Sequence, residues 1–123
     1  MLDHISIQCS DLTASTRFYD SVLGAIGAGR ILAFADRVGY GIKFPSFWIG
    51  PLETGVGFRE SHIAFAADSR ESVIAFQQAA VAVGAEVLHT AKDWPEYHPG
   101  YFGAFVRDPD GNNVEAVHHA WPK

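Results

Sequence analysis

Two histidines in this chain occupy matching positions of an internal repeat. The first copy begins His4-Ile5-Ser6-Ile7 and the second begins His62-Ile63-Ala64-Phe65. Each is followed by polar residues that favour a helix start and then by a phenylalanine, Phe18 or Phe76, and the two copies are offset by 58 residues throughout. A repeat of this length indicates two copies of one supersecondary unit. We therefore expect the copies to bring their two imidazoles to one place.

One carboxylate completes the set of side chains that could do chemistry there. Glu115 stands between Val114 and Ala116 in a strand-like segment, where an unpaired buried charge would be costly. Two neutral imidazoles and one carboxylate, with positions left open for water or substrate, suit a divalent transition metal. The alternative is that these are ordinary hydrogen-bonded strand residues. The matched positions of His4 and His62 favour the metal site.

The elements that must position these residues have the same order in both copies. In the first copy, residues 3–9 alternate between apolar and polar side chains, which predicts a strand with one face open to a cavity. A helix is expected from Asp11 to about Leu23, and short strands at 30–35, 37–43 and 44–49. The loop at 51–57 links the copies.

The second copy restarts at Ser61. Its helix follows Asp68-x-x-Glu71, which resembles a capping box, and ends at Gly84. Strands are expected at 86–89, 101–107 and 113–119, with a long polar loop at 90–100. Asp108-Pro-Asp-Gly-Asn112 predicts a tight turn. The pattern as a whole predicts an α+β protein.

Composition limits the kind of protein this can be. A chain of 123 residues with 48% hydrophobic residues is long enough for one domain with its own core. Cys9 is the single cysteine, which excludes an intrachain disulfide and, with no leader-like N-terminus, suggests a cytoplasmic location. A net charge of −5 argues against nucleic acid as a partner, and no apolar run predicts a membrane span.

Several motifs together resemble those of the vicinal oxygen chelate superfamily, the group of glyoxalases, bleomycin-resistance proteins and extradiol dioxygenases. They are His4-Ile5, Arg17-Phe18-Tyr19, Ser61-His62-Ile63-Ala64-Phe65 and Phe105-x-x-Asp108-Pro-Asp-Gly-Asn112-x-x-Glu115. The resemblance implies a single glyoxalase-like domain over residues 1–123. It would contain two tandem βαβββ modules, about 1–52 and 58–123, that form a cupped mixed sheet. It also implies that His4, His62 and Glu115 hold the metal, which could be Fe, Mn, Zn or Ni.

The sequence departs from the glyoxalase I pattern at one position. Those enzymes have a fourth metal ligand, a glutamate, on the last strand of the first module. Here that segment is Phe44-Pro45-Ser46-Phe47-Trp48-Ile49, which has no acid, and Glu53 lies beyond it in the loop. The resemblance therefore favours a three-ligand site over glyoxalase I chemistry. We expect Phe47 or Trp48 to line the substrate pocket instead, and at most one of them, since adjacent strand residues face opposite sides.

A second group of polar side chains lies near the start of a late strand. Tyr101 should border the site, and its hydroxyl or the imidazole of His98 could hydrogen-bond a substrate oxygen or move a proton. We expect these two residues to be catalytic, with an ordinary surface loop as the alternative. His118 and His119 should face opposite sides and be solvent residues at the chain end, and His89 has no evident role.

These features support more than one function. The first is a metal-dependent enzyme, a dioxygenase or a lyase or isomerase, that acts on a small molecule chelated through vicinal oxygens. The second is a metal-free drug-binding protein of the bleomycin-resistance kind, and a third is a thiol transferase like those that confer fosfomycin resistance. The resemblance also implies a homodimer, in which His4 of one chain could join His62 and Glu115 of the other.

Overall fold

A computed structural model describes residues 1–121 of the chain. Its elements, in order, are β1 (Ile5–Gln8), α1 (Leu12–Gly24), β2 (Gly29–Ala33), β3 (Val38–Gly41), β4 (Phe47–Gly50), β5 (His62–Ala66), α2 (Arg70–Ala82), β6 (Val87–Asp93), β7 (Tyr101–Arg107) and β8 (Asn113–His119). Each half is therefore a βαβββ unit, which confirms the predicted duplication and the α+β class. Neither helix of the described residues is long and apolar enough to cross a membrane.

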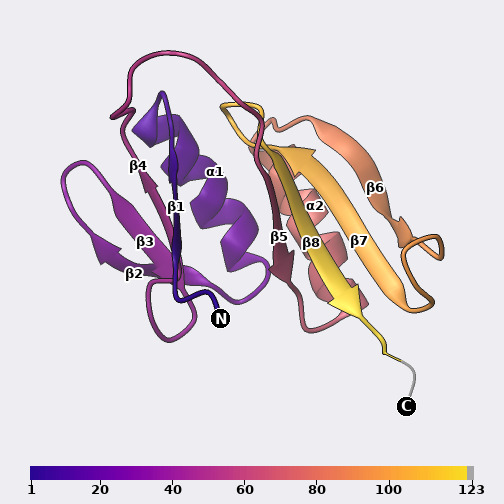
Figure 1. Cartoon of the computed structure of the whole chain (residues 1–123). Coiled ribbons are helices and arrows are strands. Elements are labelled where there is room, and N and C mark those ends of the chain that lie inside the picture. The colour runs from indigo at the N-terminus through magenta and orange to yellow at the C-terminus, as the bar shows by residue number, and fades with distance from the viewer. Residues whose placement is uncertain (122–123) are drawn as a thin grey trace.

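The strands form two mixed sheets of identical topology. Their orders are β1-β4-β3-β2 and β5-β8-β7-β6, with the first pair of each sheet parallel and the others antiparallel. Figure 1 shows α1 and α2 on the same side of the two sheets. Each sheet therefore has one face covered by a helix and one that we call the open face. Alternate strand residues point to these two faces.

One core lies between the helices and the covered faces and joins the two units. Phe47 of β4 packs against Tyr19 of α1, with ring centroids 4.9 Å apart, and against Phe65 of β5 at 5.0 Å. The helices also touch directly, because the Ser21 hydroxyl donates to the Ala79 carbonyl at 3.3 Å. The shared core fixes how the two open faces are oriented relative to each other.

Some predicted boundaries were wrong. Strand β6 continues past His89 to Asp93, because its pairing with β7 resumes after two register irregularities. The cap of α2 is Ser69 rather than Asp68, since the Ser69 hydroxyl accepts the backbone N–H of Ser72 at 3.1 Å. Strand β3 is shorter than the predicted 37–43 segment.

The turn between β7 and β8 fastens the second unit to the first. The buried carboxylate of Asp108 accepts hydrogen bonds from the Tyr19 hydroxyl of α1 at 2.8 Å, from the backbone of Asp110 at 3.0 Å, and from the backbone and side chain of Asn112 at 2.9 and 2.8 Å. Asp110 in turn accepts from the hydroxyl of Ser10, just beyond β1, at 2.6 Å. The predicted turn is thus also a contact between the units.

Replacing Asp108 by alanine should lower the free energy of unfolding by about 3 kcal/mol or more, because buried donors lose their shared acceptor. Urea denaturation followed by circular dichroism measures this loss. Asp93→Ala is the control: its exposed carboxylate pairs with Arg70 at 2.8 Å, and such a surface pair contributes at most about 1 kcal/mol. Equal losses in the two variants would contradict the role given to Asp108.

Candidate functional site

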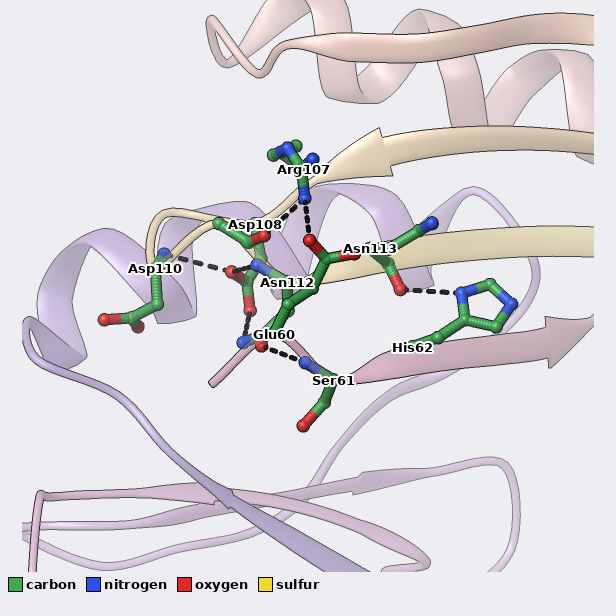
Figure 2. Close-up of polar contacts among 9 residues, drawn as sticks. Glu60, Ser61, His62, Arg107, Asp108, Asp110, Asn112 and Asn113 are labelled. Atoms are coloured by element: carbon green, nitrogen blue, oxygen red, sulfur yellow. Dashed lines mark hydrogen bonds and ion pairs between the residues drawn. The ribbon is translucent and has the colours of Figure 1, made fainter. Parts of the chain in front are cut away.

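His62 opens β5 and lies on the open face of the second unit. Its Nδ1 is 3.1 Å from the backbone carbonyl oxygen of Asn113, the residue with which it pairs on β8 (Figure 2). A carbonyl oxygen can only accept, so Nδ1 carries the proton and Nε2 of the neutral ring carries the lone pair. The side chain of Asn112, the residue just before β8, also holds this segment, because it accepts the backbone N–H of Ser61 at 2.9 Å. The backbone therefore sets both the position and the tautomer of His62.

Glu115 lies on the same open face, and its side chain is only 1% exposed. One carboxylate oxygen, Oε1, is 3.0 Å from Nε2 of His62. The other, Oε2, accepts a hydrogen bond from the Tyr101 hydroxyl on β7. Gly103 leaves room for this arrangement, since a Cβ there would lie 2.9 Å from Oε2. Burial raises the pKa of Glu115, and the hydrogen bond from the Tyr101 hydroxyl opposes that rise.

This geometry brings two electron-pair donors together. With His62 neutral and Glu115 ionised, a lone pair and an anionic oxygen face each other across 3.0 Å, which is repulsive unless a proton or a cation lies at the pair. Metal–ligand bonds of about 2.0–2.2 Å place adjacent ligand atoms roughly 3 Å apart. The Asn113 carbonyl and the Tyr101 hydroxyl stand behind the two groups, as the partners that orient metal ligands do. The pair fits two ligands of a divalent-metal site.

His4 is not part of this pair within one chain. It precedes β1, and its Nδ1 is 2.7 Å from Oδ1 of Asp3. The opposite end of β1 leads to Ser10, which contacts Asp110 next to the start of β8. His62 lies at that end, since β1 and β5 run in opposite directions (Figure 1). Within residues 1–121 of a single chain, no group of three His, Cys, Asp or Glu side chains could hold a metal ion.

The two predicted pocket residues of β4 face opposite sides, as expected. Phe47 is buried in the core, so it does not line the open face. Trp48 lies on the open face and lines a pocket of about 250 Å³ with His4, Ser6, Phe34 and Arg37. Of the two, only Trp48 shares a face with a predicted metal ligand.

Of the two residues predicted to be catalytic, Tyr101 contacts Glu115, whereas His98 contacts the Tyr101 ring, with centroids 5.5 Å apart, and not Glu115 itself. The Nε2 atom of His98 is 2.9 Å from Nδ1 of His119, and the ring of Trp121 stacks on both imidazoles at 4.0 and 4.8 Å. The prediction that His118 and His119 face opposite sides is confirmed, because His118 binds the Ala67 carbonyl at 3.0 Å instead. Both are partly buried, so describing them as solvent residues was wrong.

His89 is a residue of this face that the sequence did not reveal. It pairs with Phe105, which pairs with Glu115, so all three share the open face. Its ring packs edge-on against Phe105 at 5.5 Å and Trp94 at 5.2 Å. The register is irregular on both sides of His89, so the face on which His89 lies could not be predicted by counting alternate residues along the strand.

Comparison with known proteins agrees with this architecture. Residues 1–116 match the family model described as Glyoxalase/Bleomycin resistance protein/Dioxygenase superfamily. The chain belongs to this superfamily. It is 26% identical over 126 residues to the uncharacterized protein YqjT of Bacillus subtilis (strain 168), a match that covers 94% of this chain and 97% of that protein.

Solved structures of the superfamily superpose over nearly the whole chain. A glyoxalase/bleomycin resistance protein from Albidiferax ferrireducens T118 has a TM-score of 0.82 and 31% identity, covering 94% of this chain and 97% of that one. A lactoylglutathione lyase from Agrobacterium tumefaciens has a TM-score of 0.69 and 21% identity, covering 94% and 90%. The second likeness shows the fold alone.

Glu115 should make the stability of the metal-free protein depend on pH. Because its pKa is raised above the ordinary value, the folded state binds more protons than the unfolded state between the two pKa values. Its contribution is then complete below the ordinary pKa and is lost as the pH rises through the raised one. The difference in unfolding free energy between wild type and Glu115→Gln should therefore move against the wild type as pH rises.

Urea denaturation at a series of pH values in the presence of a chelator measures that difference. Glu96→Gln is the control, because Glu96 is exposed in the 90–100 region and its difference from wild type should stay flat. A wild-type-minus-Glu115→Gln difference that does not change with pH would contradict the buried, proton-binding Glu115 described above.

Proposed function

We propose that this protein is a divalent-metal-dependent enzyme that binds a small molecule through two neighbouring oxygen atoms. The observation that carries the proposal is the 3.0 Å distance between Nε2 of His62 and Oε1 of Glu115. The Asn113 carbonyl holds the other side of His62, and the Tyr101 hydroxyl holds the other oxygen of Glu115. Membership of a superfamily that contains glyoxalases and dioxygenases supports a reaction of the lyase, isomerase or dioxygenase kind.

The residues of the second unit would hold the metal and control its surroundings. Bound there, Fe, Mn, Zn or Ni would supply a Lewis acid that polarises the substrate oxygens. Burial and the adjacent Glu115 carboxylate raise the pKa of Tyr101, so its hydroxyl stays protonated and keeps donating. Tyr101 is in this proposal a positioning residue for Glu115. Phe105, buried beside His62 with ring centroids 5.9 Å apart, keeps water from that side of the imidazole.

The third ligand, His4, would come from a second copy of the chain. Both open faces point the same way, because both helices lie on the same side of the sheets (Figure 1). A partner related by a two-fold axis and laid on these faces would place the first unit of one chain over the second unit of the other, giving two equal sites. It would also cover Leu32 and Phe34, which are 46% and 59% exposed. Both lie on the open face, because Leu32 pairs with Gly39 and Phe34 stacks on Trp48.

Metal-free binding of a drug-like molecule is the second candidate, and one observation favours it. A protonated His62 would form a stable ion pair with Glu115 at the same 3.0 Å, with no metal. The thiol-transferase alternative gains less support, because it requires a cationic pocket for a phosphonate. Arg37 beside His4 is already paired with Asp36 at 3.2 Å and Glu53 at 3.1 Å.

Metal content separates these candidates. Protein saturated with Zn²⁺ or Ni²⁺ and then dialysed should retain about one equivalent per chain, as a three-ligand site does. His62→Ala and Glu115→Gln should each lose most of it, because each removes a direct ligand. Elemental analysis gives the values.

His89→Ala is the matched control, since His89 shares the open face but contacts Phe105 and Trp94 instead of Glu115. It should leave the metal content unchanged. Wild-type protein that keeps only a small fraction of an equivalent, at a level unaffected by His62→Ala, would overturn the enzyme proposal and favour the metal-free binder.

A further inference from the structure

Trp48 occupies the position in the first unit that Glu115 occupies in the second. In the parallel pairs, Ser6 lies opposite Trp48 and Ala64 lies opposite Glu115. Ser6 and Ala64 are each two residues after the histidine of their unit, His4 and His62. The duplicated topology therefore puts an indole where the other copy has its metal-binding carboxylate.

The neighbouring strand also differs between the two units. Across the antiparallel pair, Trp48 faces Gly39, whereas Glu115 faces Phe105. A Cβ at Gly39 would lie 2.8 Å from two atoms of the Trp48 ring, so the indole rests directly on the backbone of β3. In the second unit a carboxylate lies across from a phenylalanine ring, and in the first unit an indole lies across from a glycine.

The result is a flat apolar wall beside His4. The ring of Phe34 lies nearly parallel to that of Trp48, with centroids 6.3 Å apart and planes at 15°. Both rings line the pocket of about 250 Å³ that also contains His4. Arg37 of that pocket is paired with Asp36 and Glu53. The two rings offer contact and shape to a ligand, and the pairing of Arg37 with two carboxylates makes this pocket a poor site for an anion.

We propose that Trp48 determines specificity by selecting ligands whose chelating oxygens are attached to a planar, aromatic or conjugated ring. The inference rests on the proposed metal site, since His4 would bring this wall next to the metal held by His62 and Glu115. A planar ring stacks on an indole with more contact than a puckered saturated ring of the same size. Such stacking changes affinity by roughly three- to tenfold.

Two hydroxamates that differ only in the ring test this. Benzohydroxamate and cyclohexanecarbohydroxamate present the same pair of oxygens, so calorimetric titration of the zinc-loaded protein with each gives a ratio of Kd values. The ratio should favour the aromatic ligand roughly three- to tenfold more in wild type than in Trp48→Leu, while the Kd of the saturated ligand and the metal content stay nearly the same. Comparison between variants cancels any difference in intrinsic zinc affinity.

Trp121→Leu is the matched control, because Trp121 stacks on His98 and His119 instead. It should keep the wild-type ratio. If both hydroxamates bind and the ratio is the same in wild type and Trp48→Leu, the metal site stands and the role of Trp48 is refuted. If the protein retains no zinc and binds neither hydroxamate, the proposed function fails and this inference fails with it.

Discussion

Nε2 of His62 and Oε1 of Glu115 lie 3.0 Å apart on a face where the carboxylate is shielded from water. That contact depends on one hydrogen bond to the backbone: the Asn113 carbonyl holds the proton of His62 on Nδ1 and turns Nε2 towards Glu115. With His62 neutral and Glu115 ionised these atoms repel each other, and the burial of Glu115 leaves its carboxylate little water to relieve that repulsion. A proton or a cation must do so. The surrounding residues are arranged around that requirement, since Tyr101 satisfies the second carboxylate oxygen and Gly103 gives it space.

The position of His62 also depends on the hydrogen bonds at the junction between the units. His62 stands next to Ser61, whose N–H is held by Asn112, and Asn112 is held by Asp108. Asp108 also accepts from Tyr19 of the first unit. The position of the imidazole is therefore coupled to the contact that fixes the two open faces relative to each other. In the proposed dimer, this coupling would keep His4 of one chain in register with the site of the other.

Much of the fold could be predicted from the sequence, because the duplication, the helix caps and the tight turn are local signals. Glu115 and Tyr101 were predicted to border one site, and the structure joins them by a hydrogen bond. The features that could not be predicted depend on how the strands pair. The face occupied by His89 follows from pairing through two irregularities, and the link between His98 and His119 joins a loop to a strand end. The equivalence of Trp48 and Glu115 likewise needs the strand pairs to be known.

Whether each site is shared between two chains is tested most directly by mixing two variants that each lack one proposed metal ligand. His4→Ala and His62→Ala should each bind little metal alone. After the two are unfolded together and refolded, a mixed dimer would contain one site with both histidines intact, so metal content should recover to about one quarter of the wild-type value for random pairing. Mixed protein that binds no more metal than either variant alone would contradict a site built from His4 of one chain and His62 and Glu115 of another.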